Sequence, residues 1–151
     1  MRKQCRRKVY ALVNPIQHAI DGARITPQAA LNDLRLRELA AIESFAKGKA
    51  TLQDWCDINA MLSIAETMAL AGVGPEALVD CKAAQKALIE AARRFEATGR
   101  MGTTGIGLQA FRSLFEVNDL QRSSVQRSDY EKLIAKSMSR IRSKAKEVVE
   151  L

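Results

Sequence analysis

The stretch 51–72, TLQDWCDINAMLSIAETMALAG, constrains the fold more than any other part of the chain. Thirteen of the 20 residues at 52–71 are apolar, and at helical spacing they fall on nearly every side. A helix that is apolar all round is stable in water only when other helices cover it. The sequence therefore predicts a central helix that is surrounded by neighbours with polar outer faces.

The composition also favours helices. The chain of 151 residues is 47% hydrophobic but only 5% aromatic and has three prolines, and its length suits one core. We expect an all-α fold, a compact helical bundle of about four to five helices with a long, basic C-terminal helix. The expected domains are a basic N-terminal arm at 1–13, a helical bundle domain at 14–127 and a basic amphipathic helix at 128–151 for docking or oligomerisation.

Capping residues, prolines and glycines predict where the helices begin and end. Start signals stand at Asn14-Pro15, Thr26-Pro27, Thr51 and Gly74-Pro75, and stop signals at Gly22, Gly48, Gly72 and Gly99. Thr51 with Asp54 forms a capping-box pattern. The short connections predict antiparallel neighbours. Two stripes predict core faces: Leu31, Leu34, Leu39, Ile42 and Phe45, and then Leu78, Cys81, Leu88, Ala92 and Phe95.

The segment 99–107, GRMGTTGIG, has four glycines in nine residues. It does not match phosphate-binding motifs, because its glycines have the wrong order and it follows a helix. We expect a flexible hinge or a connector, with Thr103 or Thr104 capping the next helix. No glycine or proline follows in the last 44 residues, which predicts a long helix with a kink or break near 121–128, where Ser128 and Glu131 offer a capping box.

The net charge of +7 is concentrated at the two ends. Residues 1–8 carry +5, and residues 132–151 carry six basic and two acidic residues, or +4. The remaining 123 residues hold 13 basic and 15 acidic residues. Basic ends either keep the protein solvated and neutralise its acidic middle, or they contact phosphate.

The phosphate interpretation defines a set of candidate nucleic-acid-binding residues. These are Arg2, Lys3, Arg6, Arg7, Lys8, Lys132, Lys136, Arg140, Arg142, Lys144 and Lys146. Four of these residues follow one another at intervals of four: Lys132, Lys136, Arg140 and Lys144. This spacing predicts one basic ridge on a helix, which could follow a phosphate backbone. Neither basic end has aromatic residues for stacking on bases, and the sequence shows no helix-turn-helix or other base-reading motif. Binding would therefore have weak sequence preference and steep salt dependence, with DNA favoured over RNA.

A second pattern in the C-terminal helix predicts an apolar seam for docking or for a homo-oligomer. Its residues are Ile134, Met138, Ile141, Ala145 and Val148. The seam covers about two heptads, which is too short for an isolated coiled coil.

No convergent catalytic set is evident, so we expect neither an enzyme nor a bound metal or cofactor. His18 is the single histidine. Asp54 and Asp57 are explained by their place in the first turns of a helix. Asn59, Ser63 and Glu66 form a polar stripe on the central helix. Solvent or a subunit interface is the favoured explanation for this stripe, over a ligand pocket or a core hydrogen-bonded strip.

Three cysteines, Cys5, Cys56 and Cys81, match neither a disulfide framework nor a zinc site. We expect Cys56 and Cys81 to be small buried hydrophobes in a reducing compartment. No signal peptide or membrane-length apolar run is present. These observations predict a soluble cytoplasmic protein with no membrane contact.

Four segments carry a resemblance to a known group: VNPI, FAKGKATLQDW, NAMLSIAETMALAGVG and EATGRMGTTG. Across roughly residues 8–130 the chain resembles a group of small uncharacterised proteins encoded by phages and prophages of proteobacteria. The most specific motifs are G-x-A-T-x-x-D-W and ETMALAGVG. The resemblance implies an accessory protein made in a bacterial host, and it implies no catalytic residue or cofactor.

Two hypotheses follow. The first is a non-enzymatic phage-type accessory protein that associates with nucleic acid through its basic ends. The alternative is a protein-binding inhibitor of a host or anti-phage defence complex, which presents a basic surface to a site meant for nucleic acid.

Overall fold

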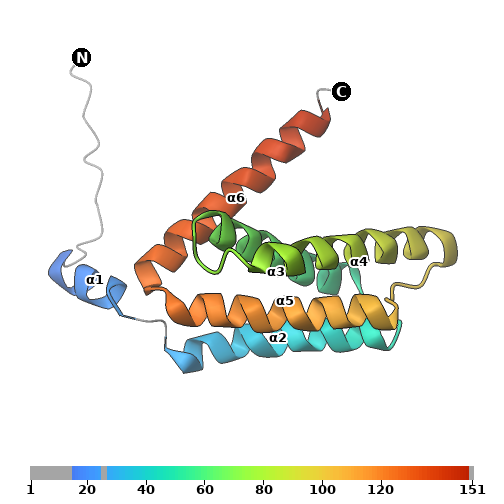
Figure 1. Cartoon of the computed structure of the whole chain (residues 1–151), viewed down its shortest axis with the longest axis horizontal. Helices are drawn as coiled ribbons and strands as arrows, with labels where there is room; N and C mark the ends of the chain where they lie inside the picture. The colour runs from blue at the N-terminus through green and yellow to red at the C-terminus, as the bar shows by residue number, and fades with distance from the viewer. Residues whose placement is uncertain (1–14, 25–26, 150–151) are drawn as a thin grey trace, which may run out of the picture.

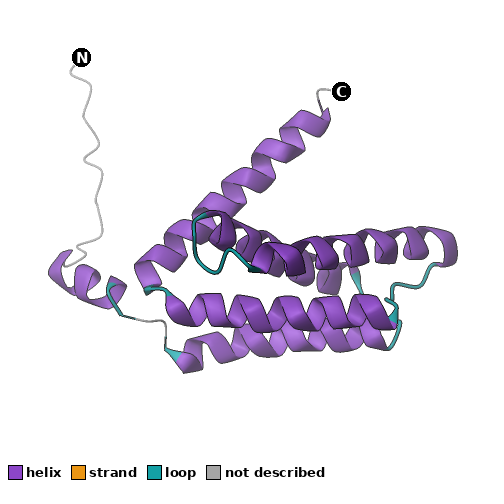
Figure 2. Ribbon diagram, viewed as in Figure 1, coloured by secondary structure: helices purple, strands orange, loops and turns teal. Residues whose placement is uncertain are grey.

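The computed structural model describes residues 15–24 and 27–149. These residues form helices without any strand, as Figure 2 shows, so the all-α prediction is confirmed. The six helices of this part are α1 (Pro15–Gly22), α2 (Gln28–Ala46), α3 (Leu52–Leu70), α4 (Ala77–Thr98), α5 (Gly105–Ser124) and α6 (Arg127–Val149).

Helix α3 is the central helix that its apolar sequence predicts. It packs against α2, α4, α5 and α6. Its buried side chains are Ile58, Met61, Leu62, Ala65, Thr67, Met68 and Ala69. At 3.6 residues per turn all but Thr67 share one face, and Thr67 lies on the opposite side, where it bonds to Arg140 of α6. Contact with neighbours on several sides explains why the sequence of α3 lacks a single apolar stripe.

Helices α2 to α5 enclose one core. Each packs against the next along the chain, and α5 returns to lie beside α2 (Figure 1). The rings of Phe45 and Phe111 meet edge to face between α2 and α5, with their centroids 5.1 Å apart. Both rings are fully buried, so this aromatic pair belongs to the core that holds α2 against α5.

The predicted helix boundaries agree with the observed ones within one or two residues. Thr51 and Asp54 form a reciprocal capping box at the start of α3. Thr104 caps α5, accepting a hydrogen bond from the backbone of Gly107 at 3.1 Å. Gly99 ends α4 with φ of 69°, a left-handed conformation that glycine adopts without strain.

The glycine-rich segment between α4 and α5 is a packed connector. Met101 is buried, and the backbone of Ala50 donates a hydrogen bond to its carbonyl at 3.1 Å. A Cβ added to Gly102 would lie 2.9 Å from the Cα of Gly48, so glycine permits two chain segments to touch here. The hinge alternative is therefore wrong for this part of the segment.

The predicted break between the last two helices is confirmed. Helix α5 ends at Ser124 and α6 begins at Arg127. The proposed capping box at Ser128 is wrong, because α6 starts before that residue. Glu131 instead pairs with Arg127 at 3.0 Å.

Two residues assigned to apolar core stripes are exposed, Leu39 at 45% and Phe95 at 39%. In α2 the buried position beside Leu39 belongs to Glu38, which is 3% exposed. A glutamate can occupy a core position when a partner neutralises it, and that partner is Arg122 of α5.

Candidate functional site

The candidate basic residues fall into three groups. Arg2, Lys3, Arg6, Arg7 and Lys8 lie outside the described residues, and Lys144 and Lys146 lie in the last turns of α6, where only the backbone is described. Lys132, Lys136 and Arg142 are exposed on α6. Arg140 is half-buried and faces the bundle.

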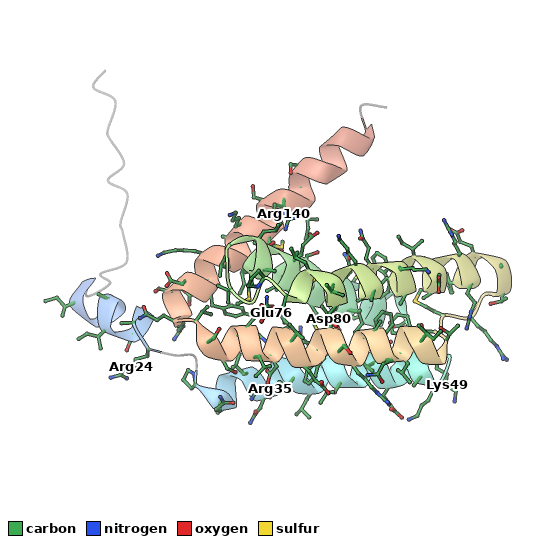
Figure 3. The ribbon with its side chains drawn as sticks, viewed as in Figure 1. Arg24, Arg35, Lys49, Glu76, Asp80 and Arg140 are labelled. Carbon is green, nitrogen blue, oxygen red and sulfur yellow. The ribbon has the colours of Figure 1, made fainter. Side chains whose placement is uncertain are left out.

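Arg140 fastens α6 to α3. Its Nη1 donates to Thr67 Oγ1 and its Nη2 donates to Glu66 Oε2, both at 2.8 Å. Figure 3 shows Arg140 where α6 crosses α3. These bonds use the guanidinium for helix docking, so its assignment to a solvent-facing ridge is wrong.

Helix geometry explains the error. A helix has 3.6 residues per turn, so each step of four residues rotates the side chain by about 40° around the axis. Two steps separate Lys132 from Arg140, which places them about 80° apart. A row spaced by four therefore winds from the solvent face of α6 toward α3.

The remaining cations on α6 differ in their partners. Lys132 pairs with Asp129 at 3.1 Å, and both side chains are more than half exposed. Lys136 and Arg142 form no ion pair with any described residue. These two carry the unpaired positive charge of the described α6 side chains.

The docking face of α6 is displaced from the predicted seam. Tyr130 and Ser137 are buried, at 8% and 2% exposed. Met138 and Ile141 are 49% and 40% exposed, whereas Ile134 is half-buried. The side chains of Ala145 and Val148 lie outside the description. The first half of α6 thus docks on α3 through Ser137 and Arg140, while Tyr130 lies beside Arg122 of α5. The C-terminal end of α6 extends away from the other helices (Figure 1).

A pocket of about 270 Å³ lies where α6 meets α3 and α4. It is lined by Asn59, Leu62, Ser63, Glu66, Leu78, Cys81, Lys82, Gln85, Ser137, Arg140 and Ile141. The polar stripe of α3 therefore borders this pocket, which was the less favoured prediction. The sequence did not favour the pocket, because its third wall comes from α6, which follows 50 residues or more later in the chain.

The two described cysteines have different surroundings. Cys81 is buried at the pocket, and burial, with help from the charges of Glu66 and Asp80, raises the pKa of its thiol to about 11. The thiol is therefore protonated at neutral pH and is a poor nucleophile. Cys56 is exposed, so its predicted burial is wrong. It lies on the side of α3 with Gln53 and Ala60, which no neighbour covers.

A buried ion pair joins α2 and α5. Arg122 donates from both terminal nitrogens to Glu38, at 2.9 and 2.8 Å. Asp119 lies 3.5 Å from Arg122 and also accepts two bonds from Arg35, which Figure 3 labels on α2. Burial raises the pKa of the Glu38 carboxyl, and the hydrogen bonds from Arg122 oppose that shift. Arg122 Nε has no partner among the described residues.

The acidic residues of α3 have structural roles. Asp54 closes the capping box, and Asp57 accepts a bond from Gln53 at 3.0 Å. Within residues 15–24 and 27–149 no group of three or more His, Cys, Asp or Glu side chains is placed to hold a metal ion. The backbone around His18 is described as part of α1, and its side chain is not. In the same part of the chain, no helix has the length and apolar character needed to cross a membrane.

Comparison with known proteins gives no relative from which to transfer a function. No protein-family model matches the sequence, and the searches among curated proteins and solved structures give no match. The resemblance to phage and prophage proteins stays a prediction from the sequence motifs. The function is therefore argued from the geometry of α6 and of the pocket.

Proposed function

We propose that this protein is a non-enzymatic, phage-type accessory protein of the bacterial cytoplasm that associates with nucleic acid through its basic ends. The observation that carries the proposal is the exposure of Lys136 and Arg142 on α6 without a carboxylate partner in the described part of the chain. Unpaired surface cations are the groups that phosphate attracts. Arg2 to Lys8 would add a second set of contacts.

The charge of the whole helix supports this proposal. The sequence of α6 holds seven basic and three acidic residues, a net charge of +4. One of the seven, Arg140, is used for docking. The others lie on a helix whose C-terminal end extends away from the bundle (Figure 1), so a nucleic-acid backbone has access to it.

The aromatic content of α6 favours backbone contacts over base contacts. Tyr130 is the single aromatic residue of α6, and it is buried at 8% exposed. It is therefore not available for stacking on bases. Contacts to phosphate alone give affinity without strong sequence preference.

A pair of double variants tests the proposal. K136E/R142E reverses two charges on α6, and K86E/R112E reverses two exposed charges on α4 and α5. The total charge is the same in both variants. Fluorescence anisotropy with a short DNA duplex and the matching RNA should show at least about a tenfold affinity loss for the α6 variant only.

Two outcomes contradict the proposal. Equal losses in both variants would mean that net charge alone causes the binding. Absence of DNA and RNA binding by the unmodified protein at low salt would remove the proposal altogether.

One observation supports the alternative function, a protein-binding inhibitor of a host or defence complex. Met138 and Ile141 are exposed on α6, close in sequence to the unpaired Lys136 and Arg142. A mixed basic and apolar surface suits a protein partner. In this case a stoichiometric partner should survive nuclease treatment during a pull-down, and M138E should release it while K86E/R112E retains it.

A further inference from the structure

The pocket between α3, α4 and α6 is lined by a serine hydroxyl that has no hydrogen-bond partner in the described part of the chain. Ser137 is 2% exposed and lines the pocket. Its hydroxyl makes no hydrogen bond with any described residue. Ser44, Ser63 and Ser123, in contrast, bond to the carbonyl four residues earlier on their own helices, at 2.8 to 3.0 Å. A hydroxyl at a pocket wall whose hydrogen-bonding capacity is unused can bond to a ligand in the pocket.

Two amide side chains at the pocket can also bond to a ligand. The half-buried Asn59 of α3 and the exposed Gln85 of α4 make no side-chain hydrogen bond within the described part of the protein. Glu66 uses one carboxylate oxygen for Arg140, and no bond occupies the other. Polar groups from the three helices that enclose the pocket are thus available to one molecule.

The charges at the pocket favour an anion. Glu66 and Arg140 pair with each other at 2.8 Å, so their charges offset each other. Lys82 also lines the pocket and has no carboxylate partner among the described residues. Among the side chains that line the pocket, one positive charge is therefore in excess, and Lys82 is the group that would pair with a carboxylate.

The remaining lining is apolar. Leu62, Leu78, Cys81 and Ile141 supply it. The volume of about 270 Å³ lies just below the range of about 300–1,000 Å³ that is typical of ligand pockets. Such a space suits a small metabolite with a short apolar body.

From these observations we infer that the pocket binds a small organic carboxylate that has an apolar body and a hydroxyl group. Lys82 pairs with the carboxylate. Ser137 and Asn59 bond to the hydroxyl, and the leucines enclose the apolar body. This inference is independent of nucleic-acid binding, because Lys136 and Arg142 do not line the pocket.

Matched probes test the inference on the full chain. Para-hydroxybenzoate and mandelate have the proposed chemistry, and para-hydroxybenzamide and mandelamide differ only in lacking the carboxylate charge. Backbone amide NMR spectra should show saturable shifts at the pocket with the acids at millimolar concentration. The amides should bind at least about tenfold more weakly, because a charge-assisted bond is lost.

Three single variants locate the binding. Lys82→Gln removes the proposed partner of the carboxylate, and Lys86→Gln removes an exposed lysine one turn away that does not line the pocket. K82Q should weaken acid binding about tenfold and K86Q should leave it unchanged. Ser137→Ala should weaken binding severalfold while its NMR spectrum stays folded.

The inference is overturned if none of the acids shifts pocket signals at about 10 mM, a concentration at which even weak fragments bind. It is also overturned if acids and amides bind alike, or if K82Q and K86Q behave alike.

Discussion

Two arginine–glutamate pairs join helices in this protein, and they differ in their exposure to water. Arg122 and Glu38 link α5 to α2 with side chains 1% and 4% exposed. Arg140 and Glu66 link α6 to α3 with side chains 28% and 37% exposed. Both pairs include a 2.8 Å contact. Arg122 donates to both carboxylate oxygens of Glu38, whereas Arg140 divides its two nitrogens between Glu66 and Thr67. Their surroundings differ as well, because water screens a half-exposed pair and cannot screen a buried one.

The difference indicates separate roles. The buried pair belongs to the core beside Tyr130, where loss of one partner leaves a charge that water cannot reach. The half-exposed pair borders the pocket and holds α6 with a smaller free energy. The bundle should therefore be insensitive to changes that loosen α6, and α6 should be the first part to open.

The largest effect is predicted for a substitution that breaks the buried pair. Arg122→Met should lower the free energy of unfolding by about 3–5 kcal/mol, because Glu38 stays buried without its partner. Urea denaturation measures the change. The double variant E38L/R122M should recover most of the loss, since no buried charge remains. A loss below about 1 kcal/mol in R122M would show that Glu38 is not held as a charged partner.

The second predicted effect is a loss of stability at high pH that arises from Cys81, at the pocket beside the half-exposed pair. The raised pKa of Cys81, about 11 against 9.0 for a free thiol, means that the folded state favours the neutral thiol. The stability that the protein gains from burying a neutral thiol is fully present below about pH 9. It is lost as the pH rises to about 11, because the thiol ionises first in the unfolded state. The loss should be about 2–3 kcal/mol.

Urea titrations of the unmodified protein and of Cys81→Ala measure this effect as a difference between two curves, which removes other groups that titrate in the same range. The difference should shrink between pH 9 and 11. Parallel curves would contradict the neutral thiol.

At neutral pH, in a Cys5→Ser background, a thiol reagent should modify the exposed Cys56 and spare Cys81 until the protein unfolds.

The smallest effect belongs to the half-exposed pair. A double-mutant cycle of Arg140→Ala and Glu66→Gln should give a coupling of about 0.5–1 kcal/mol, because water screens these charges. Hydrogen exchange should become faster in α6 and stay unchanged in the core of α2 and α5. The Lys132 and Asp129 pair, whose side chains are 76% and 54% exposed, is the control, and its cycle should show no measurable coupling. Coupling as large as for the buried pair would contradict the comparison.

The sequence predicted the features that depend on local chemistry. The apolar residues around its circumference predict the central helix. The capping residues Thr51 and Thr104 predict where α3 and α5 begin. These signals act within a few residues, so no knowledge of tertiary contacts was needed.

Features that depend on a distant partner were missed. Glu38 was not identified as a core residue, because its burial requires Arg122, which lies 84 residues away. Arg140 was assigned to the surface, because its partners Glu66 and Thr67 lie on another helix. A pocket at the polar stripe of α3 was the less favoured prediction for the same reason. Cys56 was misplaced because α3 is apolar on all sides, so its sequence does not reveal which side faces water.

The most direct test of nucleic-acid association is the salt dependence of duplex binding. The logarithm of the affinity should fall linearly with the logarithm of salt concentration, with a slope near 0.9 per neutralised phosphate. K136E/R142E should reduce the slope by about two, because two phosphate contacts are lost. K86E/R112E should leave the slope unchanged. An unchanged slope in K136E/R142E would contradict the account, because α6 would then make no contact with the nucleic acid.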